Sequence, residues 1–551
     1  MTKAKSRTRC RSLSAIAVAV SGAFLGSSAH AYNFDTDPDW QVTLDNSVMY
    51  TMGWRVEGPD QRIANDPARH QSELAFDKGD MITNRLQDLI EFQAVYRNRM
   101  GVRMSGSVWK DWAYDDVSTG NPAILAAQGN VYGPTGRYRG ATERFHIEGA
   151  ELLDAFAFLN TDIGGAPVYL KAGRLTQYWG NAFYFGYSNI GYSQAAIDNI
   201  KGFSQPGSEV KELFLPRTQI LATAELSPEL SVSGQYFFEF DGNRYPEGGT
   251  YFGAADFVYN GPIQFGALAA GKEYKAKNSN ENFGVKLTWS PEWAQGDLGF
   301  YYRQFDEVHP WTMLDANAGG PGRLGFASRY ADNVKLFGFS YERVFGPAST
   351  GLEISYRKDT ALQSGIGSGV ETKGATGDLL SVVANAFVQL GTTQFYDAGT
   401  FIAELAYTHL VDVTGNEHLY LGKGDAACGG GGVDAGCATK NALALWVSFE
   451  PQWLQVAPSW DVSMPISYAW GAYGNPAYAA GGFYAKDTGI FSVGVKGTYK
   501  GNTSIALAYN GLNWNPGQVM DGPYGEMYAN GNGAYGLHKR DWVSLTLKTS
   551  F

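Results

Sequence analysis

The sequence predicts an all-β protein: a single antiparallel up-and-down β-barrel of about 16–18 strands that crosses a membrane. Three observations lead to this fold class. Strand-like alternation recurs along the chain, the connections alternate between short and long, and the chain ends on an aromatic residue in an alternating strand. The composition agrees, because the 551 residues include 69 Gly, 14% aromatic residues and only 18% charged residues. Such a profile is typical of one large β structure.

Alternation of apolar and polar residues is the first observation. In NFGVKLTW (282–289) and GLEISYR (351–357), every second residue is apolar or aromatic and those between are polar or small. The pattern also runs through most of VTLDNSVMYTMGWRVE (42–57). Successive side chains of a strand point to opposite faces. Each strand therefore has one apolar and one polar face, as a wall between lipid and a wet lumen requires.

The connections between strands are the second observation. The links RNRM, DIGGA, SPE, PEWAQ, GPA and GN are short, whereas seven other segments, given below, are long. Short turns on one rim and long loops on the other are typical of an outer-membrane barrel, with the turns in the periplasm. A further hairpin could be hidden in residues 251–271. We expect strands near residues 40–57, 84–97, 101–114, 150–161, 167–178, 218–226, 230–240, 281–290, 296–306, 333–345, 349–359, 378–390, 398–412, 441–450, 459–474, 489–500, 503–511 and 540–551, and long loops at 58–83, 115–149, 179–217, 241–280, 307–332, 413–440 and 512–539.

The first 31 residues resemble a secretory signal peptide. They contain five basic residues and no acidic ones, then an apolar run near 13–25, and they end on Ala29-His30-Ala31. The apolar run is too short to span a membrane, so we expect cleavage after Ala31 and a barrel over 32–551. Loss of five basic residues changes the net charge from −11 to −16. That acidity argues against nucleic acid as a partner.

The last strand, in RDWVSLTLKTSF, alternates up to Phe551. Chain ends normally fray, so an ordered terminal strand calls for a reason. We expect it to close the barrel against the first strand. Phe551 also resembles the C-terminal aromatic signal that the outer-membrane assembly machinery recognises. Together these features predict the outer membrane of a Gram-negative bacterium, with its lipids and that machinery as partners.

Cys428 and Cys437 are the only cysteines after the predicted cleavage site. Export to an oxidising compartment favours a small loop disulfide between them over free thiols. Two thiols without a nearby histidine pair do not suggest a metal site, and no motif suggests a cofactor.

The predicted lumen carries charges of both signs. Mixed signs argue against a selectivity ring of a single charge. Each of these residues is either part of a constriction or simply solvated or salt-bridged in the lumen, and Arg103, Glu353 and Arg357 are candidates for the constriction. The inward-facing set is Arg55, Glu91, Arg103, Lys171, Glu239, Lys286, Arg303, Glu342, Glu353, Arg357 and Glu404.

The segment after the fifth strand is the best candidate to narrow the lumen. Residues 179–217 are too many for a simple loop and are rich in aromatic residues, with a predicted short helix at Ser193–Ile200 capped by Ser193. Aromatic rings on an inserted segment suit an apolar or amphipathic solute better than an ion. The alternative is an aromatic belt beside an ordinary surface loop. The candidate residues for the constriction or solute path in this part of the chain are Arg174, Tyr178, Trp179, Phe183, Tyr184, Phe185, Glu209, Lys211 and Glu212.

The same stretch carries a family resemblance. GRLTQYWG (173–180), PGSEVKELFLP (206–216) and SPELSVSGQYFFEFDGNRYPEGGTYFGAADFV (227–258) resemble the proteobacterial outer-membrane barrel family catalogued as domain of unknown function thirteen-oh-two. The resemblance extends from about residue 40 to the C-terminus, and Leu175 stands where that family usually has Gln. The family motif residues fall on Gly173, Arg174, Trp179, Gly180, Pro206, Gly207, Glu209, Lys211 and Glu212.

The resemblance implies a partner set and a broad function. Members of that family look like barrels encoded near resistance-nodulation-division type transporters of the inner membrane and a lipoprotein-carrier-like periplasmic protein. This implies traffic of lipids or lipophilic molecules across the outer membrane. The leading hypothesis is therefore a channel or transporter barrel for hydrophobic or amphipathic solutes, working passively or with a periplasmic partner.

Four alternatives compete with this hypothesis. A general hydrophilic porin is favoured if 179–217 lies outside the lumen, and long acidic loops would also suit an adhesin or structural barrel. A secreted soluble β-sandwich would not explain the asymmetry of turns and loops. A receptor of the TonB-driven type would need a large N-terminal plug domain before the first strand.

We expect no enzymatic activity. A barrel phospholipase would need a serine and a histidine on neighbouring strands at one height. His409 is the one histidine that we place on a predicted strand, and it falls near a rim.

Overall fold

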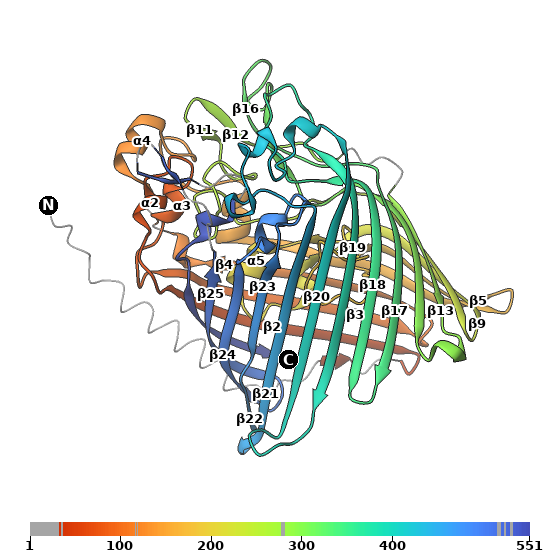
Figure 1. The fold of residues 1–551 in the computed structure, drawn as a ribbon. Helices are drawn as coiled ribbons and strands as arrows, with labels where there is room; N and C mark the ends of the chain where they lie inside the picture. The colour runs from red at the N-terminus through yellow and green to blue at the C-terminus, as the bar shows by residue number, and fades with distance from the viewer. Residues whose placement is uncertain are drawn as a thin grey trace.

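The computed structural model describes residues 32–34, 37–115, 117, 120–276, 282–514, 520–522, 525–528 and 533–551. These residues form a closed antiparallel barrel of 18 strands, each paired with its neighbour in the sequence, as predicted. The loops carry the remaining short elements, and α2–α4, β11, β12 and β16 gather above one rim (Figure 1). In the described ranges no helix is both long and apolar enough to cross a membrane. The predicted signal peptide lies outside the described residues.

All 18 predicted strands have a counterpart in the wall. β22 and β23 form one strand interrupted next to Pro465, which has no N–H to donate to the ladder; both halves pair with β21 and β24. The wall strands are β2 (Trp40–Arg55), β3 (Met81–Tyr96), β4 (Met100–Asp111), β5 (Glu148–Ile163), β6 (Ala166–Leu175), β9 (Arg217–Ser227), β10 (Leu230–Phe237), β13 (Phe283–Trp289), β14 (Asp297–Phe305), β17 (Val334–Phe345), β18 (Ala348–Ala361), β19 (Thr376–Leu390), β20 (Ala398–Gly415), β21 (Asn441–Ala457), β22 (Trp460–Ser463) with β23 (Ile466–Tyr473), β24 (Gly489–Tyr499), β25 (Thr503–Asn513) and β28 (Trp542–Ser550).

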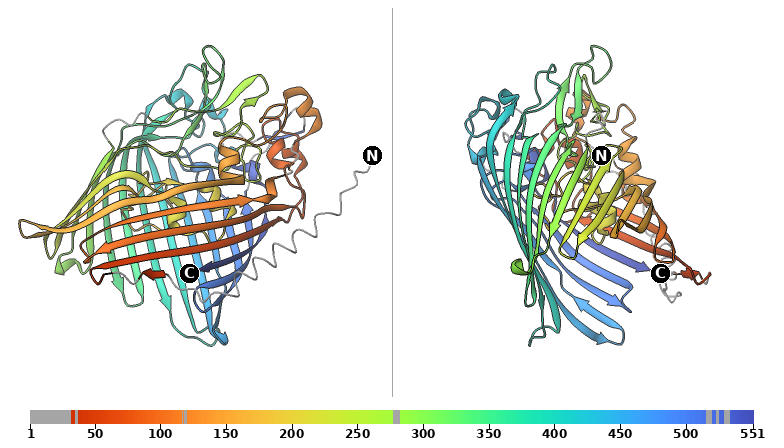
Figure 2. Two further views of the ribbon diagram at one scale, coloured as in Figure 1. Left: turned by 180° about the vertical axis from the view of Figure 1, so that it is seen from behind. Right: turned by 90° about the vertical axis from the view of Figure 1, so that its right-hand side faces the viewer.

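Most of the remaining elements lie in the connections at the long-loop rim, and the strands run obliquely around the wall beneath it (Figure 2). The stretch 251–271 adds no wall hairpin: β11 and β12 pair above the rim in a four-stranded sheet with β16 and β15. The elements outside the wall are β1 (Tyr32–Phe34), α2 (Gln61–Ala64), α3 (His70–Glu73), η1 (Trp112–Tyr114), α4 (Pro122–Gln128), η2 (Glu143–Ile147), β7 (Ala196–Ile197), α5 (Asn199–Ser204), α6 (Val210–Leu213), β8 (Phe214–Leu215), β11 (Gln264–Phe265), β12 (Leu268–Glu273), η3 (Glu292–Ala294), β15 (Trp311–Asp315), β16 (Gly325–Arg329), η4 (Glu417–Leu419), η5 (Ala426–Cys428), η6 (Val433–Ala435), η7 (Gly481–Tyr484), β26 (Met520–Asp521), β27 (Met527–Tyr528) and η8 (Gly533–Leu537).

The two faces of the wall differ as a transmembrane barrel requires. Val285, Phe300 and Phe337 on neighbouring strands are exposed on the outer face, where lipid replaces water. On the inner face Glu353 and Arg357 are 1% exposed. Near the short-turn rim, Trp293 is 71% exposed and contacts Trp289, in the manner of an interfacial aromatic girdle. The wall is thus apolar outside and polar inside.

The first and last strands close the barrel. β2 pairs with β28 from Ser47–Ser550 to Arg55–Trp542. One residue further, the backbone of Phe551 exchanges hydrogen bonds of 2.7 and 2.8 Å with Asn46. The chain therefore ends on a paired rung, as the alternation in its last strand predicted. Beyond it, β1 pairs with residues 42–44 of β2.

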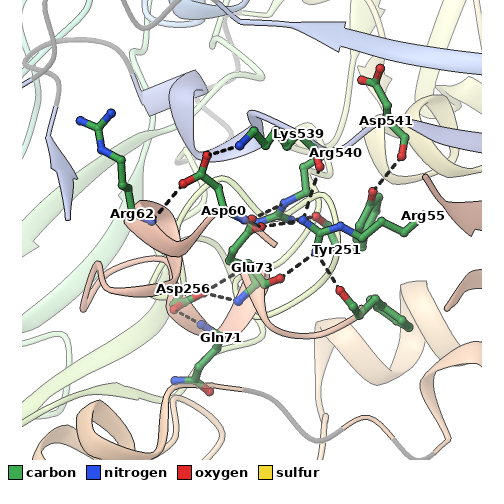
Figure 3. A network of polar contacts seen from close by, with 12 residues as sticks. Arg55, Asp60, Arg62, Gln71, Glu73, Tyr251, Asp256, Lys539, Arg540 and Asp541 are labelled. Atoms are coloured by element: carbon green, nitrogen blue, oxygen red, sulfur yellow. Dashed lines mark hydrogen bonds and ion pairs between the residues drawn. The ribbon is translucent and has the colours of Figure 1, made fainter. Parts of the chain in front are cut away.

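A buried ion cluster lies at the long-loop end of this seam (Figure 3). Arg55 Nη2 and Arg540 Nε donate to the two carboxylate oxygens of Glu73 at 2.6 and 2.7 Å, and all three side chains are 0% exposed. Two guanidinium groups face one carboxylate, so one positive charge is in excess. Both guanidinium groups lie by the Tyr251 ring, with Cζ of Arg55 5.5 Å and Cζ of Arg540 5.4 Å from the ring centre. Asp256 accepts from the backbone N–H groups of residues 71 and 72. The cluster thus fixes α3 and two loops to the seam.

Removing the carboxylate of this cluster should destabilise the barrel. We expect Glu73→Ala to leave two buried guanidinium groups without a counter-charge. Removing one partner of a buried ion pair lowers the free energy of unfolding by about 3–5 kcal/mol. The temperature at which heat-modifiable gel mobility is lost should fall. Asp521→Ala is the control, because it removes an ion pair with Arg62 whose side chains are 45% (Arg62) and 76% (Asp521) exposed. Equal midpoints for the two variants would contradict this role of the cluster.

Candidate functional site

Residues 176–216, between β6 and β9, fold into the barrel; we call them the lumenal segment. Inward-facing side chains of β3, β5, β10, β14, β18, β20 and β28 bind it. These strands are distributed around the whole circumference, so the segment crosses the lumen. Most of it is irregular in structure, with only β7, α5, α6 and β8 as short elements.

Two wall carboxylates hold the first part of the lumenal segment. Glu353 on β18 accepts from the backbone N–H groups of Asn181, of Ala182 at 2.9 Å and of Ile190 at 2.8 Å. Glu404 on β20 accepts from the N–H groups of residues 183, 184 and 185 at 2.5, 2.9 and 2.7 Å. Both carboxylates are 1% exposed. Irregular backbone needs hydrogen-bond partners when buried, and charged acceptors make strong ones.

Gly180 makes the approach to Glu353 possible. Its φ is 91°, a left-handed conformation that favours glycine. A Cβ at this position would overlap the Glu353 carboxylate. The glycine of the family motif is therefore explained by contact with the wall.

Arginines bind the carbonyl groups of the same stretch. Arg303 on β14 donates from Nη1 to the carbonyls of Ile190 and Tyr192 at 2.8 and 2.6 Å. Arg357 on β18 donates to the carbonyl of Tyr187 at 2.8 Å and lies 4.6 Å from the centre of the Tyr192 ring. Wall charges of both signs thus replace sheet partners for this backbone, which explains why the predicted inward set is mixed.

The second part of the lumenal segment binds the opposite wall. Lys201 pairs with Glu151 of β5 at 2.9 Å. Lys211 pairs with Glu91 of β3, which also binds Arg103. Further contacts include Glu209–Lys548 at 2.8 Å and Glu212–Gln87.

The predicted helix at Ser193–Ile200 is wrong. Ser193 has φ 61°, outside the helical region, and its carbonyl accepts from Arg217 at 3.1 Å. Residues 196–197 instead pair with 214–215 as β7 and β8. Helix α5 begins later, at Asn199, and is capped by Asp198, whose side chain accepts from the N–H of Lys201 at 3.1 Å.

Most of the aromatic side chains predicted for the solute path are packed. Tyr184 stacks on Trp446 of β21, with centroids 5.0 Å apart and planes at 8°. Phe185 and Trp179 are buried, whereas Phe183 is 50% exposed. Val210, on α6, is 68% exposed. The lumenal segment therefore presents apolar surface inside a lumen whose wall is polar.

The structure divides the predicted site residues into three places. Tyr178, Trp179, Phe183, Tyr184 and Phe185 lie with Glu353 and Arg357, and Glu209, Lys211 and Glu212 lie with Arg103 on the far wall. Arg174 lies apart, at the long-loop end of β6, where it pairs with Glu239 at 2.8 Å.

Three residues of this region were not among the predicted constriction residues, although Glu404 was in the predicted inward-facing set. Val210 sits inside the motif PGSEVKELFLP, and Trp446 and Glu404 have inward parity on their strands. That parity was the available signal. Cys428 and Cys437, in the loop after β20, form a disulfide.

His409 on β20 has an amide as its neighbour. Its Nδ1 lies 2.6 Å from Oδ1 of Asn441. Within the described part of the chain there is no group of three or more His, Cys, Asp or Glu residues placed to hold a metal ion.

The fold and the lumenal segment define the class: a transmembrane β-barrel with a segment folded across its lumen. The chain belongs to the family described as Protein of unknown function (DUF1302), whose model matches residues 12–551. No curated protein matches the chain.

Solved outer-membrane proteins resemble the barrel at low identity. The outer membrane channel DcaP of Acinetobacter baumannii is 10% identical, with a TM-score of 0.36 over 94% of this chain and 99% of its own. OccK9 (OpdG) of Pseudomonas aeruginosa is 10% identical, with a TM-score of 0.41 over 93% and 98%. A BenF-like porin from Pseudomonas fluorescens Pf-5 is 8% identical, with a TM-score of 0.41 over 93% and 99%.

Loosening the lumenal segment should open the lumen to ions. Glu353→Gln and Glu404→Gln keep the side-chain shape but replace the charged acceptor by a neutral amide. The amide NH₂ group cannot accept hydrogen bonds from the backbone N–H groups of the lumenal segment. We expect larger or more frequent conductance steps in planar bilayers than in the unmodified protein. Glu450→Gln is the control, because Glu450 shares the inward parity of Trp446 on β21 but makes no hydrogen bond to the described lumenal segment. Unchanged conductance in both variants would contradict the anchoring role.

Proposed function

We propose that the protein is an outer-membrane channel for hydrophobic or amphipathic, lipid-like solutes. The observation that carries the proposal is the exposed apolar surface of the lumenal segment, at Phe183 and Val210. Exposed apolar groups inside a polar lumen contact whatever passes, and they favour a solute with apolar surface over an ion or a sugar.

The position of the lumenal segment disfavours a general hydrophilic porin. An 18-stranded wall encloses enough space for a water-filled pore. Here the wall side chains bind a segment across that space, from Glu91 on β3 to Glu404 on β20. A solute must therefore pass beside the segment, in contact with its side chains.

The route ends at the short-turn rim, on the periplasmic side. Glu91 and Lys548, which hold α6, lie near the short-turn ends of β3 and β28. The exposed residue Val210 lies on the same helix. In this proposal a periplasmic carrier, coupled to an inner-membrane transporter, receives or delivers the solute there.

Uptake by proteoliposomes tests the proposal. Radiolabelled decanesulfonate at micromolar concentration is a suitable amphiphile, because its fixed charge keeps it from crossing lipid unaided. We expect uptake to exceed that of a labelled sugar of similar mass. Phe183→Ser should slow uptake roughly five-fold, since about 1 kcal/mol of apolar contact is lost.

Phe395→Ser is the matched control. Phe395 is 71% exposed and lies in the turn between β19 and β20, outside the lumen, so its loss should leave uptake unchanged. Rapid sugar entry with no preference for the amphiphile would favour a general porin instead.

A further inference from the structure

Two neighbouring pockets lie in the loops above the long-loop rim. The first has a volume of about 300 Å³ and a mostly apolar lining that includes Phe257, Trp311 and Leu421. The second has a volume of about 280 Å³ and a charged lining that includes Arg144. Tyr259 and Pro310 line both pockets, so the two pockets adjoin at these residues.

The partition residue Tyr259 is held in a strained conformation. Its φ is 67°, which is rare for a bulky side chain and is often found at ligand clamps. Its ring stacks on Tyr245, with centroids 4.9 Å apart. Tyr245 Oη lies 2.5 Å from His309 Nδ1 in the apolar pocket and 2.6 Å from Tyr187 Oη in the lumenal segment. The partition is therefore connected to the element that occupies the lumen.

The apolar pocket has little charge. Arg69, its charged lining residue, is paired with Asp66 at 2.5 Å. Burial lowers the pKa of His309 to about 3, so its ring is neutral at physiological pH. A group the size of a water molecule takes up about 30 Å³, so a pocket of this volume has room for on the order of ten heavy atoms of a chain or ring.

The charged pocket is lined by cations and carboxylates, and one of its cations has no carboxylate partner among the described residues. Arg174 is paired with Glu239 and Asp241, Lys275 with Asp241, and Arg244 with Glu151 and Asp198. The Glu273 carboxylate accepts a hydrogen bond from Tyr330 Oη at 2.7 Å. Arg144 has no ion pair with any residue that the structure describes, and it is exposed. The carboxyl of Glu247, which also lines this pocket, is mostly uncharged at neutral pH. It accepts hydrogen bonds from two backbone N–H groups, which lower its pKa, but burial outweighs them and raises the pKa to about 8.

We propose that the two pockets form one site that captures an anionic amphiphile from outside the cell. The apolar body fills the pocket of Phe257, Trp311 and Leu421, and the anionic head binds Arg144 on the other side of Tyr259. The inference rests on the proposed function, since it names the class of solute and its first point of contact. The hydrogen bond between Tyr245 and Tyr187 connects this point to the lumenal segment.

Photolabelling tests the site. The probe is decanoate with a diazirine at the end of its chain, applied to the full barrel in lipid nanodiscs and followed by peptide mapping. We expect the label on residues 257–259 and 310–312. A decylammonium probe with the same diazirine should label these residues at least ten-fold less.

Arg144→Ala should reduce labelling by decanoate about ten-fold. The matched control is Arg137→Ala, because Arg137 is exposed in the same loop and lines neither pocket. Heat-modifiable mobility shows that each variant is folded. Equal labelling by the two probes, or label confined to the lipid-facing wall or the lumenal segment, would overturn the site.

The uptake assay separates this inference from the proposed function. If the amphiphile is taken up but the pockets are not labelled, the capture site is overturned and the proposed channel function stands. Label in the pockets without uptake overturns the channel and supports a binding site.

Discussion

Backbone hydrogen bonding between β2 and β28 is the constraint on which the rest of the structure depends. Inside a bilayer, an unpaired strand edge leaves N–H and C=O groups without partners, at a cost of several kcal/mol each. The pairing from Ser47–Ser550 to Arg55–Trp542 removes both edges of the sheet. Once the sheet is closed, its polar face can point only inward, and every inward charge must find a partner in the lumen.

The lumenal segment also needs hydrogen-bond partners, in its case for backbone N–H and C=O groups. Most of its backbone is irregular and cannot satisfy itself through a ladder or a helix. Glu353 and Glu404 supply acceptors for its N–H groups, and Arg303 and Arg357 supply donors for its carbonyls. Wall and segment therefore satisfy each other, and the mixed charge of the lumen follows from the two kinds of backbone group.

The sequence predicts the wall well because the signal is local. Strand alternation has a period of two residues, so the inward parity of Glu353 and Glu404 can be read from their nearest neighbours. The path of the lumenal segment cannot be read in this way: the bond from Asn181 to Glu353 joins residues 172 apart in the chain. Ser193 shows the limit of local capping rules, since its contact with Arg217 replaces the helix start that its residue type suggested.

These contacts also restrict how a solute can pass. Glu353 and Glu404 together accept six backbone hydrogen bonds, and each charged bond contributes about 1.5–3 kcal/mol. Thermal motion does not break all of them together, so the first half of the lumenal segment stays in place. A route must therefore follow surface that is already exposed. Phe183 on the lumenal segment offers such a surface, beside the stacked pair of Tyr184 and Trp446. In the proposed channel an apolar solute would gain contacts along that route, whereas a hydrated ion would lose water without finding a new partner.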